Sequence, residues 1–164
     1  MRSLAVSLIV LLAAAAPAAA QGTVSEENTR SLNLTAYAEL LRSDVRTEKI
    51  AILTELMNFT EAEDKAFWPL YREYDAEMTK LSEERVSLIA EYGRNYSTLT
   101  DAVAATLGTK ALDLEARRQA VKAKHYERIK NALSPRTALR FLQVEQQLLL
   151  IIDLQISAAL PIVQ

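Results

Sequence analysis

The 164-residue chain contains no cysteine and only one histidine. The lack of cysteine excludes disulfide bonds, thiolate metal sites and cysteine nucleophiles. A single histidine disfavours zinc sites built on histidine pairs and most histidine-based catalysis. Three glycines and four prolines are too few for an all-β fold, which needs many turns. The glycines, Gly22, Gly93 and Gly108, also lie too far apart in the sequence to form a phosphate-binding loop.

The composition that remains is half hydrophobic, with 19 basic against 21 acidic side chains. A chain of this length buries a core without disulfide or metal staples. The charge is mixed and nearly balanced, so nothing in it indicates a nucleic-acid partner. No catalytic, metal or cofactor motif stands out, and we expect a protein that is not an enzyme and holds no cofactor.

The first twenty residues have the pattern of a secretory signal peptide. Arg2 supplies the positive start, residues 4–16 form a short apolar run, and Ala18-Ala19-Ala20 is a small-residue cleavage site. The alternative, an uncleaved membrane anchor, is disfavoured because the run is short for a bilayer span. The later apolar run at 148–163 is interrupted by Asp153, Gln155 and Pro161, so we expect no transmembrane segment in the mature chain. The short alanine-rich signal and the lack of cysteine favour a bacterial periplasm.

After the signal, residues 21–34 are polar and without periodicity, which predicts a mobile arm, and residues 35–164 form one helical domain. Apolar residues at helical spacing predict helices from 35 or 43 to 57, from 60 to 92 or 95, from 100 to 133, and from 134 to 160. The middle two are long, similar in length and separated by a short connection. The fold class is therefore all-α: a long antiparallel helical hairpin framed by a first and a last helix. A second copy would help to cover the apolar stripes, so we expect a homodimer.

The predicted helices begin at residues suited to capping. Thr60 and Glu63 have the spacing of a capping box, in which each side chain bonds the other residue's backbone amide. Thr100 is the expected cap of the next helix. Ser134 is the expected cap of the last helix, with Pro135 at its first helical position.

Two of these starts resemble a repeated family motif. The segments Phe59-Thr60-Glu61-Ala62-Glu63 and Leu133-Ser134-Pro135-Arg136-Thr137, the second followed by Phe141, are similar to the L-T-x-x-Q motif of the periplasmic Spy/CpxP stress proteins. Phe59 replaces leucine in the first copy, and Glu63 and Thr137 stand where the family has glutamine. The resemblance covers roughly residues 50–145. It implies a Spy/CpxP-like hairpin subunit that dimerises around a curved client-binding surface, with ATP-independent chaperone activity or adaptor binding to a stress sensor.

Charged groups in the chain are interpreted as surface features. Related family members bind metals, but His125 has no ligand at helical spacing and lies between lysines, so we predict an exposed helix histidine and disfavour metal sensing. The many carboxylates are predicted to form a solvated face with ion pairs such as Glu61 with Lys65. The basic residues of the third helix, including Arg118 and Lys122, are also predicted to face solvent.

Apolar segments supply the candidate contacts. Phe67, Leu70, Tyr71 and Tyr74 are predicted to form core, with Trp68 at a different angle and partly exposed. The last helix is apolar on every side around 148–152. It is either a buried helix of the bundle or dimer interface, which we favour, or an exposed binding surface. In the buried arrangement Asp153 and Gln155 would need polar partners, and a second copy of the chain is one source of them. The candidate client or dimer contacts are Trp68, Phe141, Leu148, Leu149, Ile152 and Ile156.

These patterns predict an exported, ATP-independent chaperone-like or envelope-stress adaptor protein. Its partners would be unfolded or partner polypeptides, bound through apolar helix surfaces. The alternative is a dedicated protein-interaction or signalling module that dimerises through its C-terminal helix and binds one partner, such as a periplasmic sensor.

Overall fold

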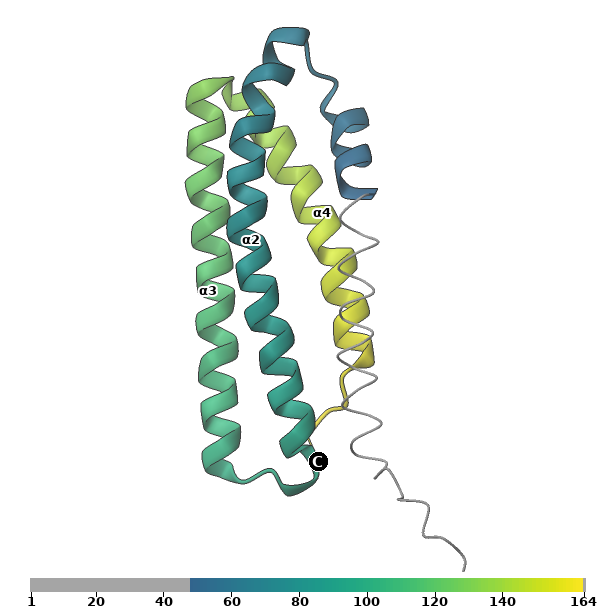
Figure 1. Ribbon diagram of the computed structural model, residues 1–164, viewed down its shortest axis with the longest axis vertical. Helices are drawn as coiled ribbons and strands as arrows, with labels where there is room; N and C mark the ends of the chain where they lie inside the picture. Colours follow the sequence, from purple (N-terminus) through teal and green to yellow (C-terminus); the bar gives the residue numbers. More distant parts are fainter. Residues whose placement is uncertain (1–47, 164) are drawn as a thin grey trace, which may run out of the picture.

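The computed structural model describes residues 48–163. This part of the chain is all-helical and contains no strand, as predicted. It comprises a helix at residues 48–57, α2 (Glu61–Asn95), a 3-10 turn η1 (Tyr96–Thr98), α3 (Asp101–Ala132) and α4 (Pro135–Ala159) (Figure 1). The predicted signal peptide, the polar arm and the start of the first helix lie outside the described residues.

The predicted caps are present at the three helix starts. The Glu63 amide donates to the Thr60 hydroxyl at 3.3 Å, and the Thr60 amide donates to the Glu63 carboxylate at 3.0 Å, which closes the capping box. Thr100 accepts from the Val103 amide at the start of α3. Ser134 accepts from the Thr137 amide at 3.0 Å, and Pro135 opens α4. The short-range pattern therefore fixes where each of these helices begins.

We expect Thr60→Ala to lower the free energy of unfolding by about 1 kcal/mol, because the first amides of α2 lose their acceptor. Urea unfolding followed by circular dichroism measures the change. Thr106→Ala is a matched control, because Thr106 is an exposed threonine inside α3 whose hydroxyl bonds only the preceding turn. Equal losses in both variants would contradict a capping role.

α2 and α3 lie side by side and run in opposite directions (Figure 1). Ion pairs join them along their length, and residue numbers rise on α3 as they fall on α2. The pairs are Lys110 with Glu91, Arg117 with Glu84, Lys124 with Glu77, and Arg128 with Glu73. The predicted pair of Glu61 with Lys65 within α2 is also present, at 2.6 Å.

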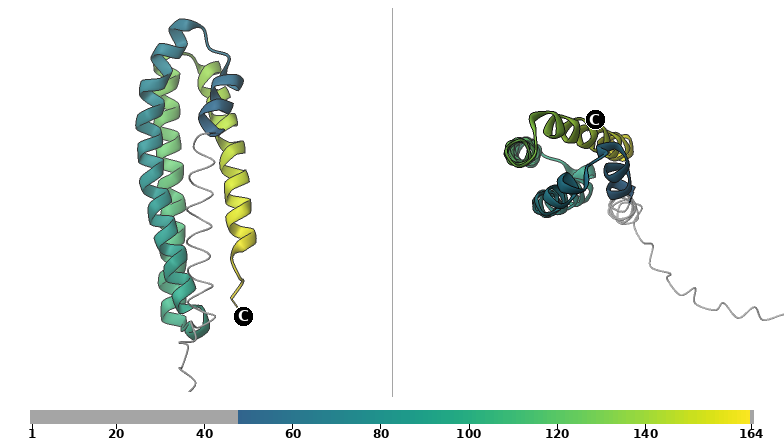
Figure 2. Two further views of the ribbon diagram at one scale, coloured as in Figure 1. Left: turned by 45° about the vertical axis from the view of Figure 1, so that its right-hand side comes forward. Right: turned by 90° about the horizontal axis from the view of Figure 1, so that it is seen from above.

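The main core lies near the start of α2, where the helix at 48–57, α2 and α4 converge (Figures 1 and 2). Phe67, Tyr71 and Tyr74 of α2 pack edge-on against Phe141 of α4, with ring centroids 5.3–6.4 Å apart. Phe141 is only 1% exposed, so it belongs to the core of the subunit. The aromatic core predicted from α2 is confirmed for these three residues.

The junction between the first helix and α2 is fixed from α4. Asn58 has a φ of 46°, the left-handed conformation that often follows a helix end. The guanidinium of Arg140 donates to the carbonyl oxygen of Met57 at 2.5 Å and so bonds the last turn of that helix. The helix at 48–57 is thereby held against α4, which places Lys49 inside the bundle.

Candidate functional site

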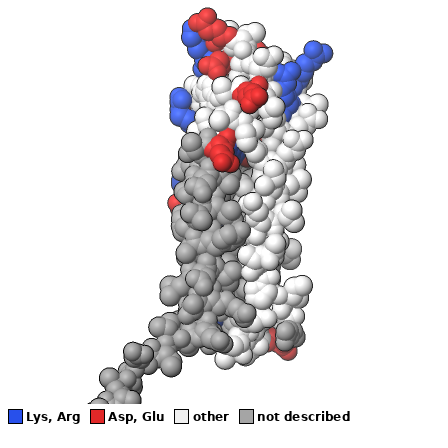
Figure 3. Space-filling model, turned by 90° about the vertical axis from the view of Figure 1, so that its right-hand side faces the viewer, with Lys and Arg blue, Asp and Glu red and all other residues white. Residues whose placement is uncertain are grey.

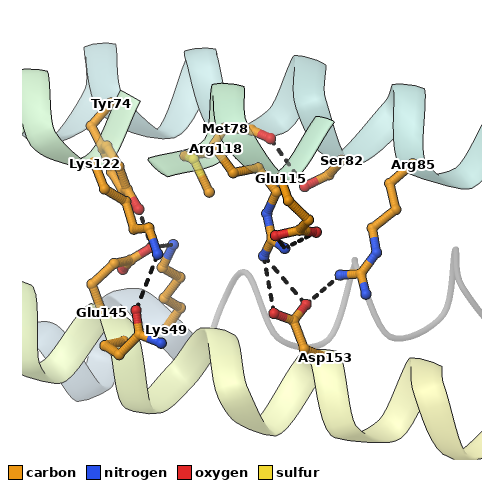
Figure 4. Close-up of polar contacts among 11 residues, drawn as sticks. Lys49, Tyr74, Met78, Ser82, Arg85, Glu115, Arg118, Lys122, Glu145 and Asp153 are labelled. Atoms are coloured by element: carbon orange, nitrogen blue, oxygen red, sulfur yellow. Dashed lines mark hydrogen bonds and ion pairs between the residues drawn. The ribbon is translucent and has the colours of Figure 1, made fainter. Parts of the chain in front are cut away.

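The orientation of α4 is set by two inward carboxylates, and the first of them is Glu145. Glu145 is fully buried and accepts from the Lys49 ammonium at 2.7 Å and from the Tyr74 hydroxyl at 2.6 Å (Figure 4). Lys49 is 6% exposed and lies 5.5 Å from the centre of the Tyr74 ring. Burial, together with the negative charge of Glu145, raises the pKa of Tyr74 well above its usual value. The Tyr74 hydroxyl therefore stays protonated and remains a donor.

The second inward carboxylate is Asp153. It accepts from Arg118 of α3 at 3.3 Å and also pairs with Arg85 of α2 (Figure 4). Arg118 also donates to Glu115 at 2.8 Å. Burial opposes the charge of Arg118, but the neighbouring Asp153 and Glu115 raise its pKa overall. Asp153 was predicted to need polar partners, with a second copy as one source, and the structure places two partners within the same chain.

The prediction that His125 is exposed is also wrong. The ring is fully buried, packs against Tyr74 at 5.4 Å between centroids, and its Nε2 lies 3.1 Å from a Glu77 oxygen. Arg118 and Lys122, predicted on a solvated face, are each 7% exposed. The inner face of α3 is a stripe of mixed polarity, because three of the side chains on it meet polar partners on α2 or α4. Burial and the charge of Arg118 lower the pKa of Lys122, whose ammonium donates to Gln146 at 3.1 Å.

The polar groups between the helices are not all satisfied. His125 Nδ1 and Glu145 Oε2 are buried and have no hydrogen-bond partner. Both residues contact Tyr74: Glu145 accepts from its hydroxyl, and the His125 ring packs against its ring. A buried polar atom without a partner costs free energy, so these two atoms offset part of the stability that the contacts around Tyr74 contribute. The bonds of Glu145 to Lys49 and Tyr74 place this side of α4 inward.

With Glu145 and Asp153 inward, the opposite side of the second half of α4 faces outward. Leu150, Ile151 and Leu154 are 56%, 55% and 71% exposed, and we call these three residues the outer patch. Leu154 follows Ile151 by three residues and Leu150 by four, so its side chain is a neighbour of both on the helix surface. In Figure 3 a long band over α4 carries no charged side chain, while charges gather near the end where the helix at 48–57 lies. Contiguous exposed apolar surface of this kind marks interaction sites.

The residues predicted as client or dimer contacts do not form one surface. Phe141, Leu148 and Leu149 are buried within the subunit, while Ile152 and Ile156 are half-buried. Trp68 is half-buried, on α2, as predicted, and its indole nitrogen donates to Asp64 at 2.6 Å. The predicted contacts do not include the three residues of the outer patch. Two carboxylates mark the inner side of α4 in the structure, the buried Glu145 and the partly buried Asp153.

Three of the carboxylates that join α2 to α3, Glu73, Glu77 and Glu84, have lowered pKa values. Hydrogen bonds from Arg128, Lys124 and Arg117 lower the pKa values of Glu73, Glu77 and Glu84, respectively, below 4.5. A carboxyl group whose pKa is lower in the folded state contributes stability above its unfolded pKa and loses it as the pH falls through the folded value.

We therefore expect the melting temperature to fall as the pH drops below about 4.5. The triple substitution of Glu73, Glu77 and Glu84 by glutamine should flatten this dependence, because the three groups no longer titrate. Thermal melts at steps between pH 7 and pH 3 measure it, with Glu83→Gln as a control on the same helix. A triple variant as acid-sensitive as the parent would contradict the assignment.

Searches for other kinds of site concern the described residues. Residues 48–163 contain no group of three or more His, Cys, Asp or Glu side chains placed to hold a metal ion. In the same range no helix is both long and apolar enough to cross a bilayer. Comparison of the chain with protein-family models, curated proteins and solved structures found no match.

Proposed function

We propose that this protein is an exported, ATP-independent chaperone-like or stress-adaptor protein that binds unfolded or partner polypeptides through the outer patch of α4. The observation that carries the proposal is an exposed apolar face of α4 whose opposite side makes one buried and one partly buried ion pair. A helix fixed in this way keeps its apolar residues in water when no partner is bound.

The charge distribution supports this proposal. The patch itself holds no charged residue, whereas α2 and α3 carry ion pairs along their junction. Apolar contact is nondirectional and tolerates many sequences, and a charged exterior keeps a complex in solution. The sequence contains no glycine-rich phosphate loop, so we propose that binding and release proceed without nucleotide. We also propose that the activity involves no catalysis.

The resemblance to the Spy/CpxP proteins fits this function and adds a location and an assembly. We propose export to the periplasm by the N-terminal signal, and a Spy/CpxP-like hairpin subunit that forms a homodimer. Cell fractionation tests the location, and sedimentation equilibrium tests the assembly. Protein found only in the cytosolic fraction would contradict the proposed location.

The proposed activity is tested by light scattering of a chemically denatured model client diluted into buffer without nucleotide. The purified protein is added from substoichiometric to excess amounts, with albumin as the control. We expect dose-dependent suppression of scattering beyond that of albumin. Scattering equal to the albumin control at every dose would refute chaperone activity.

The second candidate is a dedicated interaction module. It is favoured by the position of the outer patch, which is confined to one end of one helix. Such a module binds a single partner at fixed stoichiometry. Crosslinking in intact envelopes separates the two, because a chaperone yields many crosslinked products and a dedicated module yields one.

A further inference from the structure

A cavity separate from the outer patch lies at the other end of the bundle from the aromatic core. It has a volume of about 410 Å³ and is bounded by α2, α3 and the C-terminal tail. The apolar side chains that line it include Leu88 and Ile89 of α2, Leu107 and Leu114 of α3, and Leu160 and Val163 of the tail. The volume lies within the range of small-molecule sites, about 300–1,000 Å³.

The tail is bound over α2 next to this cavity. The Tyr92 hydroxyl donates to the Pro161 carbonyl at 2.6 Å, and the Tyr96 hydroxyl donates to the Ile162 carbonyl at 3.1 Å. These two bonds hold the segment that contributes Leu160 and Val163 to the wall. One side of the cavity is thus closed by the tail, which is not helical there.

The polar side chains in the cavity wall indicate which class of ligand fits. Its charged or hydroxyl-bearing side chains are Arg85, Tyr92 and Glu115, and each already has a partner: Asp153, the Pro161 carbonyl and Arg118, respectively. A polypeptide would bring backbone amides and carbonyls into this space, and burying them without partners is costly. A hydrocarbon chain brings no such groups, and apolar cavities take up apolar molecules readily.

We propose that this cavity holds the acyl chain of a single-chain amphiphile, with the headgroup in water at its open side. The wall carries one positive and one negative side chain, Arg85 and Glu115, both ion-paired. The protein therefore recognises the acyl chain of the ligand rather than its headgroup. A free fatty acid and a lysophospholipid are the two sources that supply it. The proposal is independent of the polypeptide-binding function, because none of the outer-patch residues lines the cavity.

Gly108 provides the variant for the test. It lines the cavity, and a Cβ atom built there meets nothing within 4 Å. Gly108→Leu therefore adds a side chain to open space without a clash. Glycine is the poorest helix former after proline, so replacing it inside α3 should leave the variant at least as stable as the parent. Ala105→Leu is the matched control, since Ala105 is exposed on α3 and does not line the cavity.

Equilibrium dialysis of the full purified protein against radiolabelled myristate and, separately, myristoyl-lysophosphatidylcholine tests the proposal. Both are used below their critical micelle concentrations. We expect saturable binding of at least one, with a Kd of about 100 µM or tighter, the scale on which one myristoyl chain enters a bilayer. Gly108→Leu should weaken it at least about tenfold, and Ala105→Leu should bind like the parent.

The two ligands distinguish the sources. Binding of both supports recognition of the chain alone, and binding of one identifies the headgroup that the open side admits. Circular dichroism of Gly108→Leu confirms that it is folded. No saturable binding of either ligand, or unchanged binding by folded Gly108→Leu, would overturn the proposal.

Discussion

Glu145→Ala should destabilise the protein by about 3–5 kcal/mol, because it leaves the Lys49 ammonium buried without its carboxylate. The Tyr74 hydroxyl loses its acceptor in the same variant. A loss of this size is a large part of the total stability of a domain, which is about 5–15 kcal/mol. Urea unfolding followed by circular dichroism measures it.

The control for this prediction is the double variant Lys49→Met/Glu145→Leu, which removes both charges and keeps apolar volume. Replacing a buried pair by apolar residues is often neutral or stabilising, so the double variant should recover most of the loss. If the double variant were as unstable as Glu145→Ala, the cost would come from lost packing, and the ion pair would not be what fixes α4.

Leu154→Lys should weaken client binding about tenfold or more without changing stability. Burying a leucine side chain contributes about 1.5–3 kcal/mol, and about 1.4 kcal/mol corresponds to a tenfold change in Kd. Because Leu154 is 71% exposed, its replacement costs the folded state little. The effect is measured as the concentration of protein that halves the light scattering of a denatured client.

Leu112→Lys is the matched control for that experiment. Leu112 of α3 is 75% exposed, so the two substitutions make the same chemical change at similar exposure. Only Leu154 has exposed apolar neighbours in the outer patch. Equal loss of activity in the two variants would mean that general surface charge, rather than the patch, governs client binding.

The helix limits and caps were predictable from the sequence because their causes are local. Thr60, Thr100 and Ser134 bond amides three residues away, and the spacing alone reveals this. The aromatic stripe Phe67, Tyr71 and Tyr74 was predictable for the same reason, since apolar residues at helical spacing mark the buried side.

The interior of α3 could not be predicted in this way. Arg118 and His125 look like surface residues because their burial depends on Asp153, Glu77 and Tyr74, which come from other helices. A pattern that treats every charged residue as solvated assigns them outward. Lys49 was also beyond local reasoning, since its partner Glu145 lies 96 residues further along the chain.

The last helix posed a different difficulty. It is apolar on all sides around 148–152, so hydropathy alone could not separate its faces. The structure divides it into a buried side with Leu148 and Leu149 and an exposed side with Leu150 and Ile151. The division follows from the two carboxylates, whose partners lie on α2, α3 and the helix at 48–57.

We propose that the outer patch of α4 contacts unfolded polypeptide. Photocrosslinking tests it most directly, with a benzophenone amino acid placed at position 154 in one variant and at position 112 in another. Both variants are irradiated with a denatured client in the absence of nucleotide. We expect client adducts from position 154 and few from position 112. Client adducts at position 112 alone, or adducts at position 154 only with a second copy of the chain, would contradict the claim.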